Sequence, residues 1–200
     1  MKETVLPYSL IKTLPQLLCF LTILLLSSHV HAQNCGAPTT DGLVGYWTLD
    51  EASGTFADSS GNGFTGTQSG GVGYGAAGVV DDAATFDGND DFITTSTSAT
   101  LDPAVVTACA WVNRTGEGSG ENWQEVIGNG NFQNYGWNLN LEPEATNATF
   151  FVNRSGARDS ATVAIETTLG WHHYCGVFDG TYAHVYVDGK LGGTSVATSL

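Results

Sequence analysis

The sequence predicts an all-β protein that folds as a two-sheet antiparallel jelly-roll sandwich. Three observations lead to this prediction. Apolar residues after position 33 do not recur with the i, i+3, i+4 spacing of a helix. Short runs of β-branched and aromatic residues recur instead between clusters of Gly, Asn, Asp and Ser. Glycine supplies 26 of the 200 residues, and many short strands joined by glycine-rich turns are typical of sandwiches and jelly rolls.

The first element, residues 1–32, has the composition of a secretory signal peptide. Two lysines give it a basic start, residues 17–26 form a short apolar centre, and small residues end it at Ala32. The apolar run is too short to span a membrane comfortably, so we expect cleavage after Ala32 and no membrane insertion of the mature chain. Residues 33–41 would be a lead-in, and 42–200 one domain of a secreted, cell-surface or periplasmic protein.

Nine strands are expected after the lead-in, each a short apolar or aromatic run bounded by turn residues. They lie near 43–49, 84–86, 92–95, 107–113, 125–127, 136–141, 149–153, 171–178 and 183–187. The connection over 51–75 is long and rich in Gly, Ser, Thr and Asn. Its segment DSSGNGFTG packs Asp58, Asn62 and three glycines into a dense turn pattern. That density predicts a structured loop rather than a flexible tether.

The last strands, GWHHYCGVFDGTYAHVYVDGK at 170–190, hold three histidines and a cysteine. Asp-Gly steps between alternating apolar runs predict a hairpin. Alternate residues of a strand point to opposite faces, so His172 and His173 diverge. A zinc site needs converging ligands, and no third ligand at a recognisable spacing accompanies His173 and His184. The pattern favours a well-formed hairpin over a metal site.

Charge and cysteine content limit the partners. The formal net charge of −14 makes nucleic acid an improbable ligand. An acidic extracellular surface is compatible with binding of calcium, which takes oxygen ligands. After cleavage the chain keeps Cys35, Cys109 and Cys175, an odd number in an oxidising compartment. One thiol therefore lacks an internal partner.

Four segments occur in the order seen in one known family: GLVGYWTLDEASGTFADSSGNGFTGT, ATFDGNDDFITT, TACAWVNR and the 170–190 hairpin. Over residues 42–195 the chain resembles laminin-G-like jelly-roll domains of the concanavalin A-like lectin/glucanase superfamily. The resemblance implies two antiparallel sheets and a mostly non-catalytic domain that binds glycans, proteins or calcium outside the cell. Such domains continue past this hairpin with closing strands. We therefore expect a fragment of a longer protein with further domains.

The resemblance also implies a disulfide. Cys109 and Cys175 match the two positions that pentraxin-like members join, which would leave Cys35 over. Both lie in the middle of predicted strands, beside Trp111 and Trp171 on the same strand face. We expect the bridge to be buried there and to stabilise the fold by about 4 kcal/mol, because it closes a long loop.

Two calcium sites are candidates. The pentraxin-like acidic-plus-Asn pair falls on Gln133 and Asn134, where Gln133 replaces a carboxylate. The second candidate is the early loop, where calcium could tie down polar backbone; the alternative is that the same side chains bond their own backbone. Its four candidate ligands are Asp50, Glu51, Asp58 and Asn62. The segment DGNDDF at 87–92 begins like an EF-hand loop, but Phe92 stands where glycine is needed and Ser98 where the bidentate Glu belongs.

The rival interpretation is a glycoside hydrolase, since glucanases share this architecture. A retaining enzyme needs two carboxyl groups ~5–5.5 Å apart. Glu121 and Glu125 share a strand face, but Trp123 stands between them in a glycine-rich region. Glu142 and Glu144 flank a proline in an expected hairpin turn. The sequence therefore predicts a non-catalytic module, with a glucanase-like catalytic or accessory domain as the alternative.

Exposed aromatic residues are the best candidates for contact with a ligand. Trp123, Tyr135 and Trp137 fall in or next to expected loops, where a ring can stack on a sugar or on a partner side chain. The other tryptophans, Trp47, Trp111 and Trp171, are expected in the core. Core packing is the alternative for the first group as well. The expected partner is an extracellular glycan or protein.

Overall fold

The structure is a computed structural model that describes residues 41–115, 123–131, 135–142, 146–154, 157–165 and 169–195. The chain divides into two compact units, Met1–Leu43 and Val44–Leu200. All of the strands below belong to the second unit. Several predictions concern residues outside those described: the expected signal peptide, the expected lead-in up to residue 40, Cys35, Glu121, Gln133, Asn134 and Glu144.

The described residues form strands and one short 3-10 helix, with no α-helix among them. The small N-terminal elements are β1 (Thr67–Ser69), β2 (Gly73–Ala77), β3 (Asp82–Thr85), β4 (Phe92–Thr94) and η1 (Ala99–Leu101). The larger strands are β5 (Val106–Arg114), β6 (Gln124–Asn131), β7 (Tyr135–Leu141), β8 (Asn147–Arg154), β9 (Ala157–Ala164), β10 (Gly170–Phe178), β11 (Ala183–Val187) and β12 (Lys190–Thr194). The predicted all-β class is confirmed.

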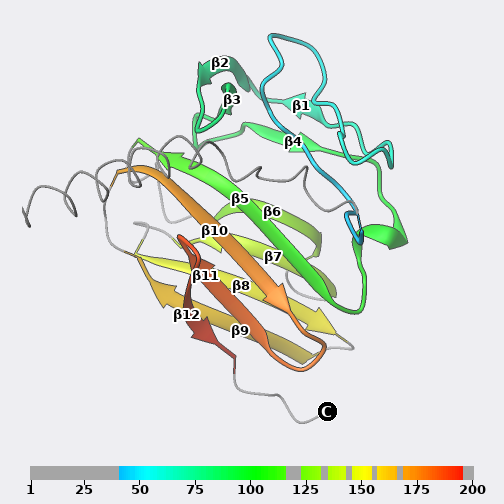
Figure 1. Ribbon diagram of the computed structural model, residues 1–200, viewed down its shortest axis with the longest axis vertical. Coiled ribbons are helices and arrows are strands. Elements are labelled where there is room, and N and C mark those ends of the chain that lie inside the picture. The colour runs from blue at the N-terminus through cyan, green and yellow to red at the C-terminus, as the bar shows by residue number, and fades with distance from the viewer. Residues whose placement is uncertain are drawn as a thin grey trace, which may run out of the picture. The chain divides into compact units, whose positions relative to one another are not determined.

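Two four-stranded antiparallel sheets make the sandwich. We call β12-β11-β10-β5 the disulfide sheet and β6-β7-β8-β9 the amide sheet. In Figure 1 the disulfide sheet, in green and orange-red, lies in front of the amide sheet, in yellow-green and yellow. Two smaller sheets pair β1 with β4 and β2 with β3. The two-sheet jelly-roll prediction is therefore confirmed.

The core lies between the two large sheets. Both sheets contribute alternate apolar residues to it, as expected when each sheet has one face buried. Its buried members are Ala108, Trp137, Leu139, Leu141, Ala148, Phe150, Val152, Ala161, Tyr174, Phe178, Ala183 and Val185.

One glycine marks the closest approach of the sheets. A Cβ atom at Gly176 of β10 would collide with the ring of Phe150 of β8. A glycine is therefore needed for this aromatic ring to approach the opposite strand so closely.

The strand predictions need corrections at residues 43–49 and at four strands that were not predicted. Two of these are β1, which lies within the stretch 51–75 expected as a connection, and β2, which begins within it. Residues 43–49 form no strand, because loop groups bond part of their backbone: Asp58 accepts from the Tyr46 N–H and Asn62 donates to the Val44 carbonyl. β9 was not predicted, since ARDSATVA has few β-branched residues. β12 was not predicted either, since KLGGT is short and contains two glycines. Both are strands because their neighbours in the sheet supply partners.

Within the described residues, no helix is long and apolar enough to cross a membrane.

Candidate functional site

The outer face of the amide sheet is the candidate site. Strand alternation places one set of residues of β7, β8 and β9 in the core and the other set on this face. We call this surface the amide face. Its residues are Asn138 and Asn140 of β7, Thr149, Phe151 and Asn153 of β8, and Arg158, Ser160 and Thr162 of β9.

A buried amide lies in the middle of this face. Asn138 is only 1% exposed, and its Nδ2 donates to Oε2 of Glu125 over 2.6 Å. Its Oδ1 has no hydrogen-bond partner within the described part of the chain. An unpaired buried acceptor is costly. Because the residue is buried, this acceptor is closed to solvent in the structure described here.

Glu125 comes from β6 and lies directly opposite Asn140 of β7. The residue as a whole is exposed to solvent. Desolvation of its carboxyl group by neighbouring atoms raises its pKa, and the hydrogen bond from Asn138 opposes that rise. A carboxyl group shifted in this direction can serve as a hydrogen-bond donor at a higher pH than an ordinary glutamate.

Two rings and a guanidinium group stack across the face. The ring of Trp123, just before β6, lies 5.4 Å from the ring of Phe151 on β8, centroid to centroid. β7 runs between β6 and β8, so the indole reaches across β7 to contact Phe151. On the other side, Arg158 places its guanidinium 5.2 Å from the centroid of Phe151, within cation-π range. Trp123 itself remains 49% exposed.

A second carboxylate lies at the edge of the amide face. Oε1 of Glu142 accepts from the Thr149 hydroxyl over 2.8 Å, and Oε2 accepts from Nδ2 of Asn147 over 2.6 Å. Its backbone N–H bonds the Asn147 carbonyl, which places it in the β7–β8 turn as expected. Glu142 is thus directed towards β8, whereas Glu125 is directed towards Asn138.

The three aromatic residues predicted to contact a ligand differ in exposure in the structure. Trp123 joins the amide face, and Tyr135 is 60% exposed at the start of β7. For Trp137 the alternative, core packing, is the one that the structure shows. Trp137 is 6% exposed, belongs to the core, and donates from Nε1 to the Leu101 carbonyl over 2.9 Å.

Sequence reasoning missed Asn138, Phe151 and Arg158. The segment WNLNL carried a usable signal for Asn138, because asparagines alternate there with leucines that must be buried. Nothing in the sequence indicated that Phe151 would lie between an indole and a guanidinium group, since their three strands meet only in the folded sheet.

The early loop bonds its own backbone, as one of the two interpretations expected. Oδ1 of Asp58 accepts from the N–H groups of Tyr46 and Ser60, and Oδ2 accepts from the N–H of Phe64. Oε1 of Glu51 accepts from the Ala57 N–H, while its buried Oε2 has no hydrogen-bond partner among the residues described here. Calcium binding by Asp50, Glu51, Asp58 and Asn62 stays a prediction.

The hydrogen bonds of Asp58 in the early loop predict how the stability of the fold depends on pH. Burial acts to raise the pKa of Asp58, but hydrogen bonds from Ser60, Phe64 and Tyr46 outweigh it and lower the pKa from 3.8 to about 2. Ionised Asp58 therefore stabilises the fold above the unfolded-state pKa, and this stabilisation is lost as pH falls towards 2. We expect Asp58→Asn to lower the free energy of unfolding by about 1 kcal/mol at pH 7, a figure reduced for solvent screening.

Urea denaturation of wild type and Asp58→Asn between pH 7 and pH 3 measures this effect, and the gap between them should narrow with acid. Asp50→Asn is the matched control, because Asp50 accepts only from the neighbouring Thr48 hydroxyl among the bonds described. A gap for Asp58→Asn that stays constant across the pH range would contradict the assignment.

Three acidic side chains also gather near β4. Oxygens of Asp87, Asp90 and Asp91 lie within 4.8 Å of one another. Asp91 accepts from the N–H groups of Gly71 and Asp87, and Asp87 accepts from that of Asn89. The group thus organises its own turn, in a segment whose sequence departs from an EF-hand loop.

The predicted disulfide is present. Cys109 and Cys175 are directly opposite each other on β5 and β10, with their Cα atoms 4.1 Å apart. The expectation that the bridge is buried is wrong: Cys109 is exposed, and Trp111, expected in the core, is 52% exposed. Both lie on the outer face of the disulfide sheet, because Ala108 of the same strand faces the core.

These features define a two-sheet all-β protein with one polar and aromatic outer face and one disulfide-bearing outer face. Residues 87–200 match the family described as the concanavalin A-like lectin/glucanases superfamily. The match spans more than half of the chain, and the chain belongs to this family. Comparison with curated proteins and with solved structures gives no match. The fold is that of a carbohydrate- or protein-binding module or of a glucanase.

Proposed function

We propose that this chain is a secreted, non-catalytic recognition module that binds glycans on the amide face. The observation that carries the proposal is the stack of Trp123, Phe151 and Arg158 on the amide face, in which Trp123 is 49% exposed and Arg158 is exposed. Sugars present apolar C–H faces to aromatic rings and hydroxyl groups to amides and carboxylates. The amide face offers both kinds of partner within one surface.

The polar groups of this face suit hydroxyl-rich ligands. The hydroxyl groups that a ligand can reach are those of Ser160 and Thr162, which are exposed on β9. Arg158 adds a cation next to the rings, which favours ligands with acidic or strongly polar substituents. Because the face mixes rings with amides, a protein partner is a weaker candidate than a glycan.

A glycoside hydrolase is the second candidate, and one observation favours it. Glu125 combines a raised pKa with a place beside the aromatic stack, as a general acid would. Against it, each of the two described carboxyl groups already accepts from protein donors: Glu125 from Asn138, and Glu142 from Asn147 and Thr149. A hydrolase needs both carboxyl groups to flank one glycosidic bond.

Glycan-array binding of the full chain, followed by calorimetric titration with the best ligand, tests the proposal. We expect Trp123→Ala to weaken binding at least tenfold, which corresponds to about 1.4 kcal/mol. Trp111→Ala is the matched control, since Trp111 is equally exposed but lies on the outer face of the other sheet. Its binding should equal that of wild type. Equal binding by Trp123→Ala would overturn the assignment to the amide face.

Two additional arms separate the alternatives. Incubation with the bound glycan should release no new reducing ends; release that is abolished by Glu125→Gln would establish the hydrolase instead. Repetition in the presence of a calcium chelator tests the calcium prediction for the early loop, whose Glu51 Oε2 would be a ligand. Unchanged affinity and unchanged thermal stability would remove calcium from the proposed function.

A further inference from the structure

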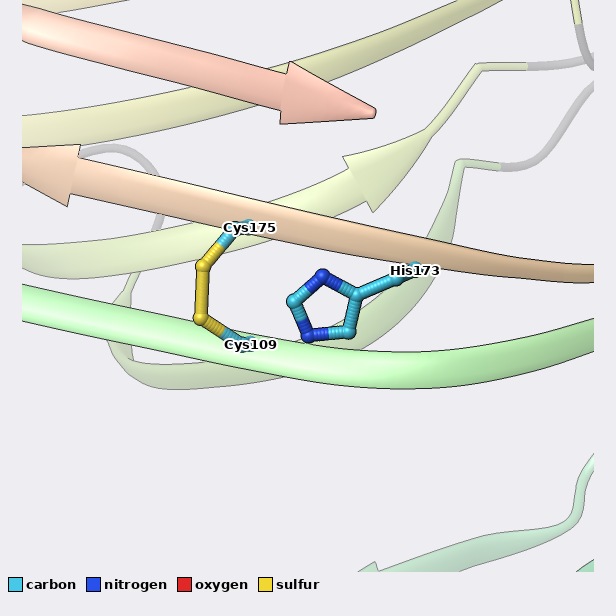
Figure 2. Close-up of side chains that lie close together, drawn as sticks. All are labelled: Cys109, His173 and Cys175. Atoms are coloured by element: carbon cyan, nitrogen blue, oxygen red, sulfur yellow. A yellow bond between two sulfur atoms is a disulfide. The ribbon is translucent and has the colours of Figure 1, made fainter. Parts of the chain in front are cut away.

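Three side chains that can bind a soft metal ion meet on the outer face of the disulfide sheet. Cys109 and Cys175 are opposite each other, and His173 lies two residues before Cys175 on the same face of β10. Figure 2 shows the imidazole of His173 beside the bond between the two sulfurs. One ligand atom from each of the three residues lies within 4.8 Å of the others.

The strands hold these groups together without the disulfide. β5 and β10 pair continuously from Gly170 opposite Arg114 to Phe178 opposite Val106. The opposite faces of both strands contribute Ala108, Tyr174 and Phe178 to the core. Breaking the sulfur–sulfur bond therefore leaves two thiols that still face each other.

The sulfurs can be reached from solvent. Cys109 is exposed, and its neighbour on the same face, Trp111, is 52% exposed. Attack by a thiolate on a disulfide requires such access, whereas a bridge buried between the sheets would be protected. The outward orientation that the sequence did not predict is what makes this chemistry accessible.

We propose that reduction of the Cys109–Cys175 disulfide creates a binding site for a divalent metal ion of the zinc class, with Cys109, Cys175 and His173 as ligands. A thiol reductant supplies two electrons and two protons, is itself oxidised to a disulfide, and leaves two cysteine thiols. Metal binding then releases both protons, because cysteine binds as the thiolate. The oxidised protein has no such site, so the redox state of the bridge decides whether metal binds.

The ligand set and spacing agree with this class of ion. Zinc takes thiolate sulfur at ~2.3 Å and imidazole nitrogen at ~2.0–2.1 Å, so tetrahedral ligand atoms lie about 3.5–3.8 Å apart. In the oxidised protein the two sulfurs are bonded to each other, so after reduction they must move apart to this separation by side-chain rotation. The ligand nitrogen of His173 lies within 4.8 Å of both sulfurs. Two sulfurs and one nitrogen leave the fourth position for water on the solvent side.

The backbone of His173 is fixed in place for this role. Its N–H donates to Oδ1 of Asp188 over 2.9 Å, and its carbonyl accepts from the Asp188 N–H over 2.8 Å. The neighbouring histidines are engaged elsewhere: His172 contacts the Asp188 carboxylate, and His184 contacts Asp179 and Thr194. Of these three histidines, His173 is therefore the one placed to act as a ligand together with the two sulfurs.

Cobalt titration tests the proposal. The full chain carrying Cys19→Ser and Cys35→Ser, so that only the bridge supplies sulfur, is reduced with a phosphine, freed of it under inert gas, and titrated with Co²⁺. We expect thiolate-to-cobalt charge-transfer absorption that saturates at one ion per chain and disappears on addition of Zn²⁺. The oxidised protein should show none. Zn²⁺ should also raise the melting temperature of the reduced protein and leave that of the oxidised protein unchanged.

His173→Ala should weaken Co²⁺ binding at least tenfold in the same background. His184→Ala is the matched control, a histidine on the same face of the sheet with partners of its own, and should bind like the parent. Circular dichroism establishes that each reduced protein keeps its β-sheet spectrum. Three results would overturn the proposal: no charge-transfer band in a folded reduced protein, equal affinity with and without His173, or loss of the sheet spectrum on reduction alone.

Discussion

Replacing Phe150 by alanine is expected to lower the free energy of unfolding by about 3–5 kcal/mol. Phe150 is fully buried in β8, and its ring fills the space left by Gly176 of the opposite sheet and lies 6.5 Å from the ring of Trp137. Both neighbours are anchored in paired strands, so the site cannot collapse around the smaller side chain. The result would be a cavity between the sheets, which adds to the lost burial of the ring.

Guanidinium denaturation of the two proteins measures this loss. Phe92→Ala provides the control, because Phe92 is half exposed on β4 and lies outside the core. Its effect should stay within about 0.5 kcal/mol. If Phe150→Ala cost no more than Phe92→Ala, the two large sheets could not pack face to face as described.

Removal of the disulfide is the second large effect that we expect. The bridge joins residues 66 positions apart, and closing a loop of that length stabilises the fold by about 4 kcal/mol in the chain-entropy model. Because Cys109 is exposed, the double replacement Cys109→Ala with Cys175→Ala creates little cavity. The loss should therefore come from greater freedom of the unfolded chain.

The contribution of the unfolded chain can be measured separately from the total loss of unfolding free energy. The dependence of unfolding free energy on denaturant should become steeper in the double variant, since an unfolded chain without the cross-link exposes more surface. Reduced wild type should behave like the double variant in a metal-free buffer. A loss under about 1 kcal/mol, or an unchanged slope, would show that the bridge does not restrict the unfolded chain.

The two outer faces of the sandwich have different chemistry. The amide face gathers acceptors, donors and rings around Asn138, and the disulfide sheet carries the Cys109–Cys175 bridge beside His173. The core separates these surfaces, since Phe150 and Val152 of β8 and Tyr174 and Phe178 of β10 all point inward. Substitutions on one face are therefore suitable controls for experiments on the other.

Much of the architecture could be predicted from local sequence pattern. The alternation in GWHHYCGVF and its Asp-Gly turn predict β10 and β11, and the structure pairs Phe178 with Ala183 across that turn. The absence of helical periodicity predicts the all-β class. The pairing of Cys109 with Cys175 followed from the resemblance to pentraxin-like domains, and the register of β5 and β10 confirms it.

The sequence by itself determined which residues share a strand face, because that depends only on the two-residue repeat of an extended chain. It did not determine which face meets the other sheet. Trp111 and Trp137 look alike along the chain, yet one is exposed beside the disulfide and the other is buried against Phe150. Only the packing of two sheets decided this, since burial is a property of what lies opposite. The Trp123–Phe151–Arg158 stack and the trio around His173 also depend on the folded sheets. The stack forms across the consecutive strands β6 to β9, and the trio forms where β5 pairs with β10, which is distant in the sequence.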